Sequence, residues 1–169
     1  MATLSFSTHF PKRMGGKETN FVGKIWQSLF NKIVPESDID KFLYSANGYQ
    51  ANIFDFCKGQ HAPKLHTIRT DEKDRWKVGD KIHMVVFNRT KNRFQFAPVL
   101  EVKGIQNIKI AYMDEFMGSP IVIIDNVVQE KKAVKTLALN DGFESVEQFF
   151  KWFNEDFTGK IIHWTELKY

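Results

Sequence analysis

The N-terminal half of the chain changes its hydrophobic period twice. From Leu4 to His9, apolar or β-branched residues alternate with polar ones, which predicts a short strand. Apolar residues then recur at helical spacing from Phe21 to Leu29, which predicts a helix from about Thr19 to Asn31. Residues 34–60 follow neither period throughout; they suggest helical pieces that could form an insertion.

The second half is dominated by period-two patterns, typical of strands. The turn chemistry of Gly and Asp predicts a turn over Trp76–Asp80. Around it we expect strands at Leu65–Arg69, Lys81–Asn88 (with Ile82, Met84 and Val86 on one face), Phe94–Tyr112 (one strand or two, bent near Gly104, with Pro98 at an edge or bulge), Pro120–Val128 and Ile161–Leu167.

A helix is predicted to begin after Ser145. Ser145 and Gln148 have the spacing of a capping box. Val146, Phe149, Phe150 and Phe153 follow at positions i, i+3, i+4 and i+7, the stripe of a helix that docks on a core. Gly159 is expected to end this region.

These elements amount to five to seven strands and two to four helices without regular strand–helix alternation. The expected fold class is therefore α+β, with a mixed, mostly antiparallel sheet that could close into a small barrel with flanking helices. We treat residues 1–169 as a single domain, because no repeat or linker divides the chain.

Composition excludes several classes of protein. A single Cys rules out a disulfide scaffold and a Cys-rich zinc module. The apolar run at Pro120–Asp125 is too short for a membrane helix, and no signal peptide is visible, so we expect a cytoplasmic protein. The 16 Phe residues are mostly expected in the core, whereas Phe94 and Phe96 are kept as ligand-contact candidates.

The net charge of +4 is unevenly distributed. Residues 58–93 contain ten Lys or Arg and four Asp or Glu, a net charge of +6, so the rest of the chain has −2. Such a basic segment suits a polyanion or a phosphorylated substrate, and a solvated, salt-bridged surface is the alternative.

The sequence Lys64-Leu65-His66-Thr67-Ile68-Arg69 is the main candidate site. Alternation along a strand puts Thr67 and Arg69 on one face, with Lys64 just before it. A point charge, a hydroxyl and a planar guanidinium together could hold an anion or a polar ring edge. An exposed basic strand is the alternative.

This motif, together with Val78-Gly79-Asp80 and the later sequence Asn140-Asp141-Gly142-Phe143-Glu144-Ser145-Val146, resembles the ASCH domain family of the PUA-like superfamily. The match runs in order from about Lys58 to Tyr169. The resemblance implies a small β-barrel that binds RNA or a nucleoside-type molecule. The family usually has a Gly two residues before its Lys, where this chain has Ala62.

The resemblance also implies an alternative function. Some small ASCH proteins hydrolyse the amide of N4-acetylcytidine with a Lys, a Thr and a Glu. Lys64 and Thr67 match the first two, and the Glu falls nearest to Asp141, which is one carbon shorter. A Lys in such a role needs burial or a cationic neighbour such as Arg69 to lower its pKa. The sequence does not decide whether the protein is an enzyme.

Further candidates follow from charge and aromatic content. Arg75 and Trp76 could contact RNA, the indole by stacking, although a Trp in such a turn more often closes one end of a barrel. Arg89, Lys91 and Arg93 could contact phosphates, or could only keep a hairpin tip soluble. Glu101 is expected to face solvent, and His163 with Trp164 to lie in the core or on the sheet surface.

Neither a metal nor a cofactor is predicted. Cys57, His61 and His66 have a loose metal-like spacing but lack a fourth ligand, so we attribute it to chance. A non-catalytic protein-interaction module that uses residues 34–60 is the remaining alternative. The sequence does not give the oligomeric state.

Overall fold

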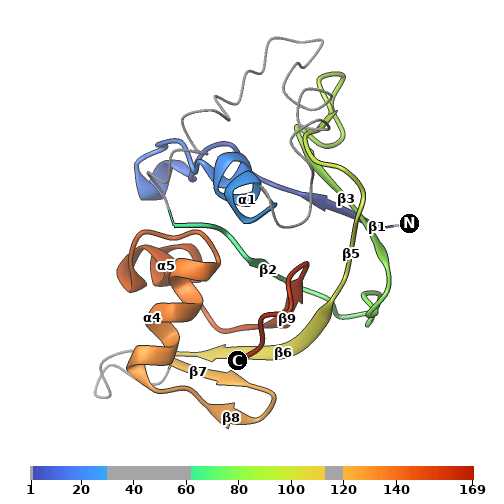
Figure 1. Cartoon of the computed structure of the whole chain (residues 1–169). Coiled ribbons are helices and arrows are strands. Elements are labelled where there is room, and N and C mark those ends of the chain that lie inside the picture. The colour runs from blue at the N-terminus through green and yellow to red at the C-terminus, as the bar shows by residue number, and fades with distance from the viewer. Residues whose placement is uncertain (1, 30–61, 113–119) are drawn as a thin grey trace. The chain divides into compact units, whose positions relative to one another are not determined.

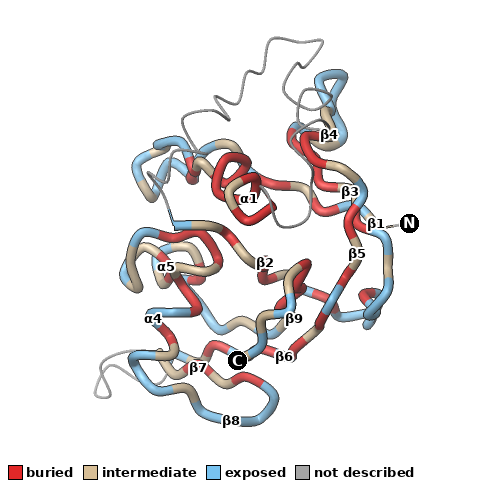
Figure 2. Tube along the Cα trace, viewed as in Figure 1, coloured by how far each residue is buried: buried red, intermediate tan, exposed pale blue. Residues whose placement is uncertain are grey.

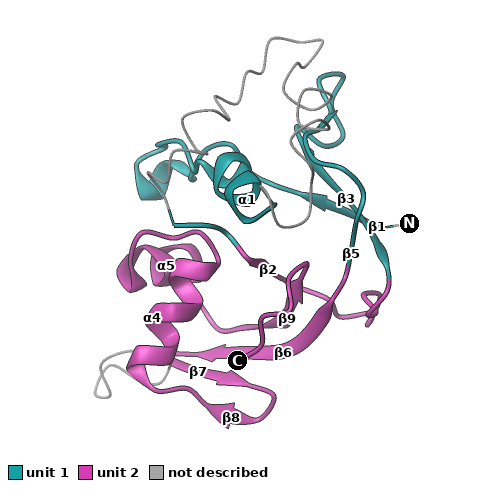
Figure 3. Cartoon of the chain, in the orientation of Figure 1, with its two compact units in different colours: residues 1–64, 80–101 teal, residues 65–79, 102–169 magenta. Residues whose placement is uncertain are grey.

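The computed structural model describes residues 2–29, 62–112 and 120–169, so the predicted insertion at residues 34–60 lies outside the described part. The chain divides into two compact units (Figure 3). Unit 1 comprises residues 1–64 and 80–101, and unit 2 comprises residues 65–79 and 102–169. Lys64 is thus the last residue of the first segment of unit 1.

Unit 1 is built on a four-stranded sheet (Figure 1). Its central strand, β3 (Lys81–Val86), pairs in parallel with β1 (Ala2–Ser5) and antiparallel with β4 (Phe94–Gln95) and β5 (Leu100–Glu101). A 3-10 turn (Lys12–Met14) and the helix α1 (Phe21–Leu29) complete the described part of the unit. Ile82, Met84 and Val86 are all buried, as their alternation predicts.

The core of unit 1 joins α1 to the segment after β4. The indole Nε1 of Trp26 donates to the carbonyl of Phe96 at 2.9 Å, and the rings of Phe6 and Phe96 meet edge to face at 5.8 Å. Phe96 is therefore a core residue rather than the ligand contact that we expected. Phe94, the other candidate, is half-buried.

Unit 2 contains a five-stranded antiparallel sheet in the order β2-β9-β6-β7-β8. The strands are β2 (His66–Arg69), β6 (Gly104–Ala111), β7 (Ile121–Ile124), β8 (Val127–Val128) and β9 (Phe157–His163). The helices α4 (Lys131–Asn140) and α5 (Val146–Trp152) lie beside this sheet (Figure 1). Figure 2 shows that β8 is exposed, whereas buried residues alternate along β6 and occupy the end of β9.

The core of unit 2 lies on one face of this sheet. Ile108 and Ile110 of β6 stand opposite Ile124 and Val122 of β7, and all four are buried. The buried side chains of the helical region add to it: Val134, Leu137, Ala138, Phe143, Phe149 and Phe153. The Phe stripe predicted for α5 thus supplies core side chains, although Phe150 stays half-buried.

The prediction of an α+β fold with mostly antiparallel sheets is confirmed. Among the described residues there are three α-helices, and no closed barrel is found. No helix in these residues is both long enough and apolar enough to cross a lipid bilayer.

Two strand predictions were wrong because turns were missed. Residues 94–112 form three strands, not one or two: Pro98 has no N–H for a ladder, and the backbones of Val102 and Lys103 bond to Gly79 and His163 instead. Residues 120–128 form a hairpin, because Asp125 and Asn126 have φ values of 48° and 69°, as in a two-residue hairpin turn.

The closing strand was predicted too late in the chain. Gly159 does not end the region but lies inside β9. A Cβ atom at this position would collide with the carbonyl oxygen of Arg69, so only glycine permits this close approach of β2.

One helix was missed and one helix start was right. α4 was not predicted, although its buried Val134, Leu137 and Ala138 have helical spacing. At α5, the hydroxyl of Ser145 accepts from the N–H of Gln148, as predicted. The return bond of the capping box comes from the N–H of Glu144 rather than from that of Ser145.

The cap at α5 gives a first prediction. Substitution Ser145→Ala removes the acceptor for the Gln148 N–H and is expected to lower the free energy of unfolding by about 1 kcal/mol. Ser145→Asn keeps a capping acceptor and should cost much less. Urea denaturation of both variants and the wild type measures the difference; equal stability of all three would contradict the role of the cap.

Candidate functional site

The Lys-x-x-Thr-x-Arg motif lies at the start of β2, as predicted. Lys64 and Thr67 are almost fully buried, with exposed fractions of 2% and 3%. The Nζ atom of Lys64 lies 4.7 Å from the centre of the Phe21 ring, and its backbone N–H donates to the carbonyl of Lys24, both in unit 1. A desolvated ammonium group over an aromatic face is a favourable cation–π contact.

Thr67 and Arg69 share a face of β2 in unit 2. In the antiparallel register they stand opposite Ile162 and Lys160 of β9. Burial lowers the pKa of Arg69 from its ordinary value, and the nearby carboxylate of Asp141 opposes this shift. Convergence of Lys64 with Thr67 and Asp141 on one pocket stays a prediction, because Lys64 belongs to unit 1.

Asp141 is placed by the end of α4. Its backbone N–H donates to the carbonyl of Leu137, and Gly142 follows with a φ of 89°, so Asp-Gly forms a helix-ending turn. The side chain is only 3% exposed, and its Oδ1 atom lies 3.6 Å from Nδ1 of His66. The carboxylate that the sequence paired with Lys64 thus lies beside a histidine and also interacts electrostatically with Arg69.

A cluster of polar and aromatic side chains surrounds His66. Its Nε2 atom is 2.7 Å from the hydroxyl oxygen of Tyr169, which accepts a hydrogen bond from Nδ2 of Asn140 at 2.9 Å. The centre of the His163 ring lies 5.2 Å from the centre of the His66 ring and 6.0 Å from the centre of the Tyr169 ring. We call His66, Asn140, Asp141, His163 and Tyr169 the histidine cluster.

Tyr169 is held in the cluster through its backbone as well. Gln106 of β6 donates to the Tyr169 carbonyl at 2.8 Å and accepts from the Tyr169 N–H at 2.9 Å. The same amide group donates to Asp125 at 3.0 Å. One buried glutamine side chain thus fixes the position of the phenol.

The sequence did not identify this cluster. His66 was considered only as a metal ligand, His163 was assigned to the core or sheet surface, and Tyr169 was not considered. Alternation along each strand was readable, but the register that puts His66 opposite His163 is a long-range property of the sheet.

The cluster strongly perturbs two titratable groups. Burial, aided by the positive charge of Lys168, lowers the pKa of His163 to about 4, and Asp125 opposes the shift. Burial raises the pKa of Tyr169 well above its ordinary value; Asp141 adds to this, and the hydrogen bond from Asn140 opposes it. At neutral pH, His163 is thus uncharged and Tyr169 keeps its proton.

Neither ring nitrogen of His163 has a hydrogen-bond partner among the described residues. The side chain is fully buried, and a buried polar group without a partner costs about 1–3 kcal/mol. A protonated His163 ring would have two N–H donors without an acceptor in the described part of the chain, so burial disfavours its charged form.

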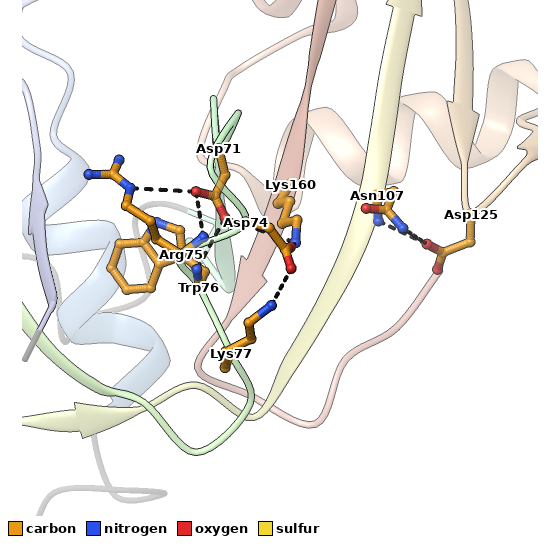
Figure 4. Close-up of polar contacts among 8 residues, drawn as sticks. All are labelled: Asp71, Asp74, Arg75, Trp76, Lys77, Asn107, Asp125 and Lys160. Carbon is orange, nitrogen blue, oxygen red and sulfur yellow. Dashed lines mark hydrogen bonds and ion pairs between the residues drawn. The ribbon is translucent and has the colours of Figure 1, made fainter.

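The basic residues near Trp76 are largely neutralised by acidic neighbours (Figure 4). Asp71 accepts from the backbone N–H groups of Arg75 and Trp76 at 3.0 and 3.1 Å, and Nε of Arg75 lies 3.7 Å from its carboxylate. Asp74 forms ion pairs with Lys77 and Lys160. Burial alone would raise the pKa of Asp71, but these N–H donors and the nearby cations together hold it below its ordinary value.

Trp76 is a core residue rather than a stacking platform. Only 7% of it is exposed, so its ring offers no face on which a base could stack. The predicted RNA contact through Trp76 is therefore not supported. The burial of Trp76 is consistent with a core role, whereas its closing of a barrel stays a prediction.

In the loop between β3 and β4, the basic side chains are not neutralised in this way by the described residues. Arg89, Lys91 and Arg93 are all exposed, and none of them forms an ion pair with a residue that the structure describes. Phe87 at the start of the loop is 38% exposed. We call residues 87–93 the basic loop.

Glu101 has a different role: it faces solvent and pairs with Lys81 at 2.8 Å.

No group of three or more His, Cys, Asp or Glu side chains within residues 2–29, 62–112 and 120–169 could hold a metal ion. Of the three residues with metal-like spacing, Cys57 and His61 lie outside these ranges. His66 is engaged in the histidine cluster.

The buried His163 gives a second prediction. The unfolded chain takes up the His163 proton near pH 6.5, whereas the folded protein does so only near pH 4. The unfolded state therefore binds more protons between these values, and stability falls as the pH is lowered through this window, by up to about 3 kcal/mol. His163→Gln should lose this part of the pH dependence.

Denaturation of the wild type and of His163→Gln from pH 7.5 to pH 4 measures the effect. The difference in unfolding free energy between the two proteins should shift in favour of the variant as the pH falls. A difference that is the same at every pH would contradict the assignment.

Comparisons with known proteins assign no family to the chain. No family model, no curated protein and no solved structure matches it. The ASCH resemblance stays a prediction from the sequence motifs, and the function proposed below relies on the residues of this chain.

Proposed function

We propose that the protein binds single-stranded RNA through the basic loop. The observation that carries this proposal is the group of three exposed cations, Arg89, Lys91 and Arg93, that no described acidic side chain neutralises. Such cations release counterions when they contact phosphates, which drives binding to nucleic acid. The exposed Phe87 adds a ring face on which an unpaired base can stack.

The contrast with residues 71–77 supports this assignment. There, Arg75 and Lys77 lie beside Asp71 and Asp74, so a phosphate would have to compete with carboxylates. Of the basic segment recognised in the sequence, the part in unit 1 is thus better suited to RNA than the part in unit 2. Arg75 contributes less than the sequence suggested.

The sequence resemblance supports the same function. PUA-like domains commonly bind RNA, and the proposal includes the small PUA-like barrel as the finer description of the α+β fold. The predicted cleft of Lys64, Thr67, Arg69 and Asp141 remains the proposed site for a nucleoside. A protein-interaction role for residues 34–60 concerns a segment outside the described residues.

The RNA proposal predicts a specific salt dependence. Replacing the three cations by Gln (Arg89→Gln, Lys91→Gln, Arg93→Gln) should weaken binding to single-stranded RNA. Each phosphate contact contributes about 0.7 to the slope of log K against log salt, so the slope should become shallower by about 2. Fluorescence anisotropy between 50 and 300 mM salt is a suitable measurement.

A control variant with the same change in net charge isolates the loop. Lys131, Lys132 and Lys135 are exposed on α4 in unit 2, and their triple replacement by Gln also removes three positive charges. This control should keep the wild-type slope. Equal losses in the two variants would show a general charge effect, and a wild type without salt-dependent binding would refute the proposal.

A second candidate function is hydrolysis of an acylated nucleoside such as N4-acetylcytidine. It is favoured by the burial of Lys64 and Asp141, because Lys and Asp side chains are seldom buried to this depth and buried ionisable groups are candidates for functional sites. Burial is one of the two conditions under which a Lys side chain becomes a useful base or nucleophile.

The enzymatic candidate predicts acetate release that depends on Lys64. Wild type incubated with N4-acetylcytidine should produce cytidine, and Lys64→Ala should be slower by about 100-fold or more. Lys24→Ala, which removes another buried lysine of unit 1, is the matched control and should retain turnover if folded. No turnover by the wild type would reject this substrate.

A further inference from the structure

The histidine cluster contains a chain of two hydrogen bonds that meet at the Tyr169 oxygen. Nδ2 of Asn140 is a donor only, so it occupies one lone pair of that oxygen. The contact of 2.7 Å between the oxygen and Nε2 of His66 has two possible directions, and the charge beside the other ring nitrogen of His66 favours one of them. Tyr169 is protonated at neutral pH, and burial raises its pKa further.

The carboxylate of Asp141 favours one tautomer of His66. Nδ1 lies 3.6 Å from this carboxylate, which is too long for a hydrogen bond but favours an N–H at Nδ1 electrostatically. A neutral ring with its proton on Nδ1 leaves Nε2 as an acceptor, so the hydroxyl of Tyr169 is then the donor of the 2.7 Å contact. Asn140 and Asp141, adjacent at the end of α4, therefore act on opposite ends of the relay.

The partly exposed members of the chain are Tyr169 and Asn140. His66 is fully buried and Asp141 nearly so, whereas Tyr169 and Asn140 are half-buried. The phenol oxygen also has a second lone pair that can accept a proton from outside. The arrangement is that of a nucleophile–histidine–carboxylate triad in which a phenol replaces the alcohol.

We propose that Tyr169, His66 and Asp141 form a proton relay that takes a proton from a water molecule or hydroxyl group at the Tyr169 oxygen. Tyr169 is the catalytic residue, His66 receives its proton, and Asn140 and Asp141 are positioning residues. The relay itself depends only on this geometry, whereas its use in amide hydrolysis rests on the enzymatic candidate above.

The hydrolytic step balances without a further reactant. One O–H bond of water breaks as its proton passes to the Tyr169 oxygen, while the phenol proton passes to Nε2 of His66. The oxygen of water forms a bond to the amide carbonyl carbon, and Asp141 stabilises the imidazolium. When the C–N bond breaks, the same proton returns through Tyr169 to the leaving amine.

The tautomer of His66 tests the relay without a substrate. Long-range proton–nitrogen NMR of the wild type at pH 7.5 should show a protonated Nδ1 and an unprotonated Nε2. Tyr169→Phe removes the donor to Nε2 and should shift this ring toward the other tautomer, and Asn140→Ala should shift it in the same direction. A wild-type ring protonated at Nε2, or one unchanged in Tyr169→Phe, overturns the proposal.

Tyr112→Phe is the matched control. Tyr112 is also in unit 2, and its hydroxyl donates to the carbonyls of Phe150 and Phe153 rather than to a histidine. Removing this hydroxyl should therefore leave the nitrogen signals of His66 unchanged, and a tautomer shift in this control would overturn a specific role of Tyr169.

Kinetics separate the relay from the proposed substrate. If the wild type hydrolyses N4-acetylcytidine, Tyr169→Phe should lower kcat by about 100-fold with little change in KM, and Asp141→Asn should alter the acidic limb of the pH profile. A Tyr169→Phe variant with wild-type kcat overturns the catalytic role. If the wild type is inactive, the hydrolytic candidate fails, and the NMR result alone supports or overturns the relay.

Discussion

The pairing of β9 with both of its neighbours is the interaction on which the candidate chemistry of unit 2 depends. All seven residues of β9 pair with β6, and four of them pair with β2 on the other side. Gly159 makes this possible, because any side chain there would displace the Arg69 carbonyl. The resulting register puts His163 directly opposite His66 and Lys160 opposite Arg69.

Alternation along β2 separates the motif into two faces. Thr67 and Arg69 point to one face of β2, and His66 points to the other, where Asp141 and Tyr169 meet it. His66, which lies between the matching residues Lys64 and Thr67, therefore has polar contacts of as much interest as those of the motif itself. The motif is defined by Lys64, Thr67 and Arg69, so it does not identify His66.

Local signals were sufficient for much of the fold. The cap at Ser145, the Phe149 and Phe153 stripe and the alternation of β3 were each readable within about ten residues, and each is confirmed. The hairpin at Asp125-Asn126 was missed although its residue types favour a turn, because the β-branched run around it dominated the interpretation.

The candidate site was predictable only in part, for a different reason. Lys64, Thr67 and Asp141 are each buried, and the partners of such side chains depend on contacts between distant segments. Asp141 and His66 are 75 positions apart in the chain, and Tyr169 and His66 are 103 apart. Spacing alone could therefore not predict that Asp141 lies beside His66.

RNA binding by the basic loop and the proton relay depend on different physical properties of the chain, so neither function implies the other. RNA binding by the basic loop needs exposed charge that stays hydrated until it meets phosphate. A proton relay needs the reverse, because burial of His66 excludes water that would compete for its hydrogen bond with Tyr169. The basic loop belongs to unit 1 and the relay to unit 2, so substitutions can remove either property while leaving the other intact. An RNA-binding protein without hydrolytic activity is consequently as consistent with these contacts as an enzyme that uses both units.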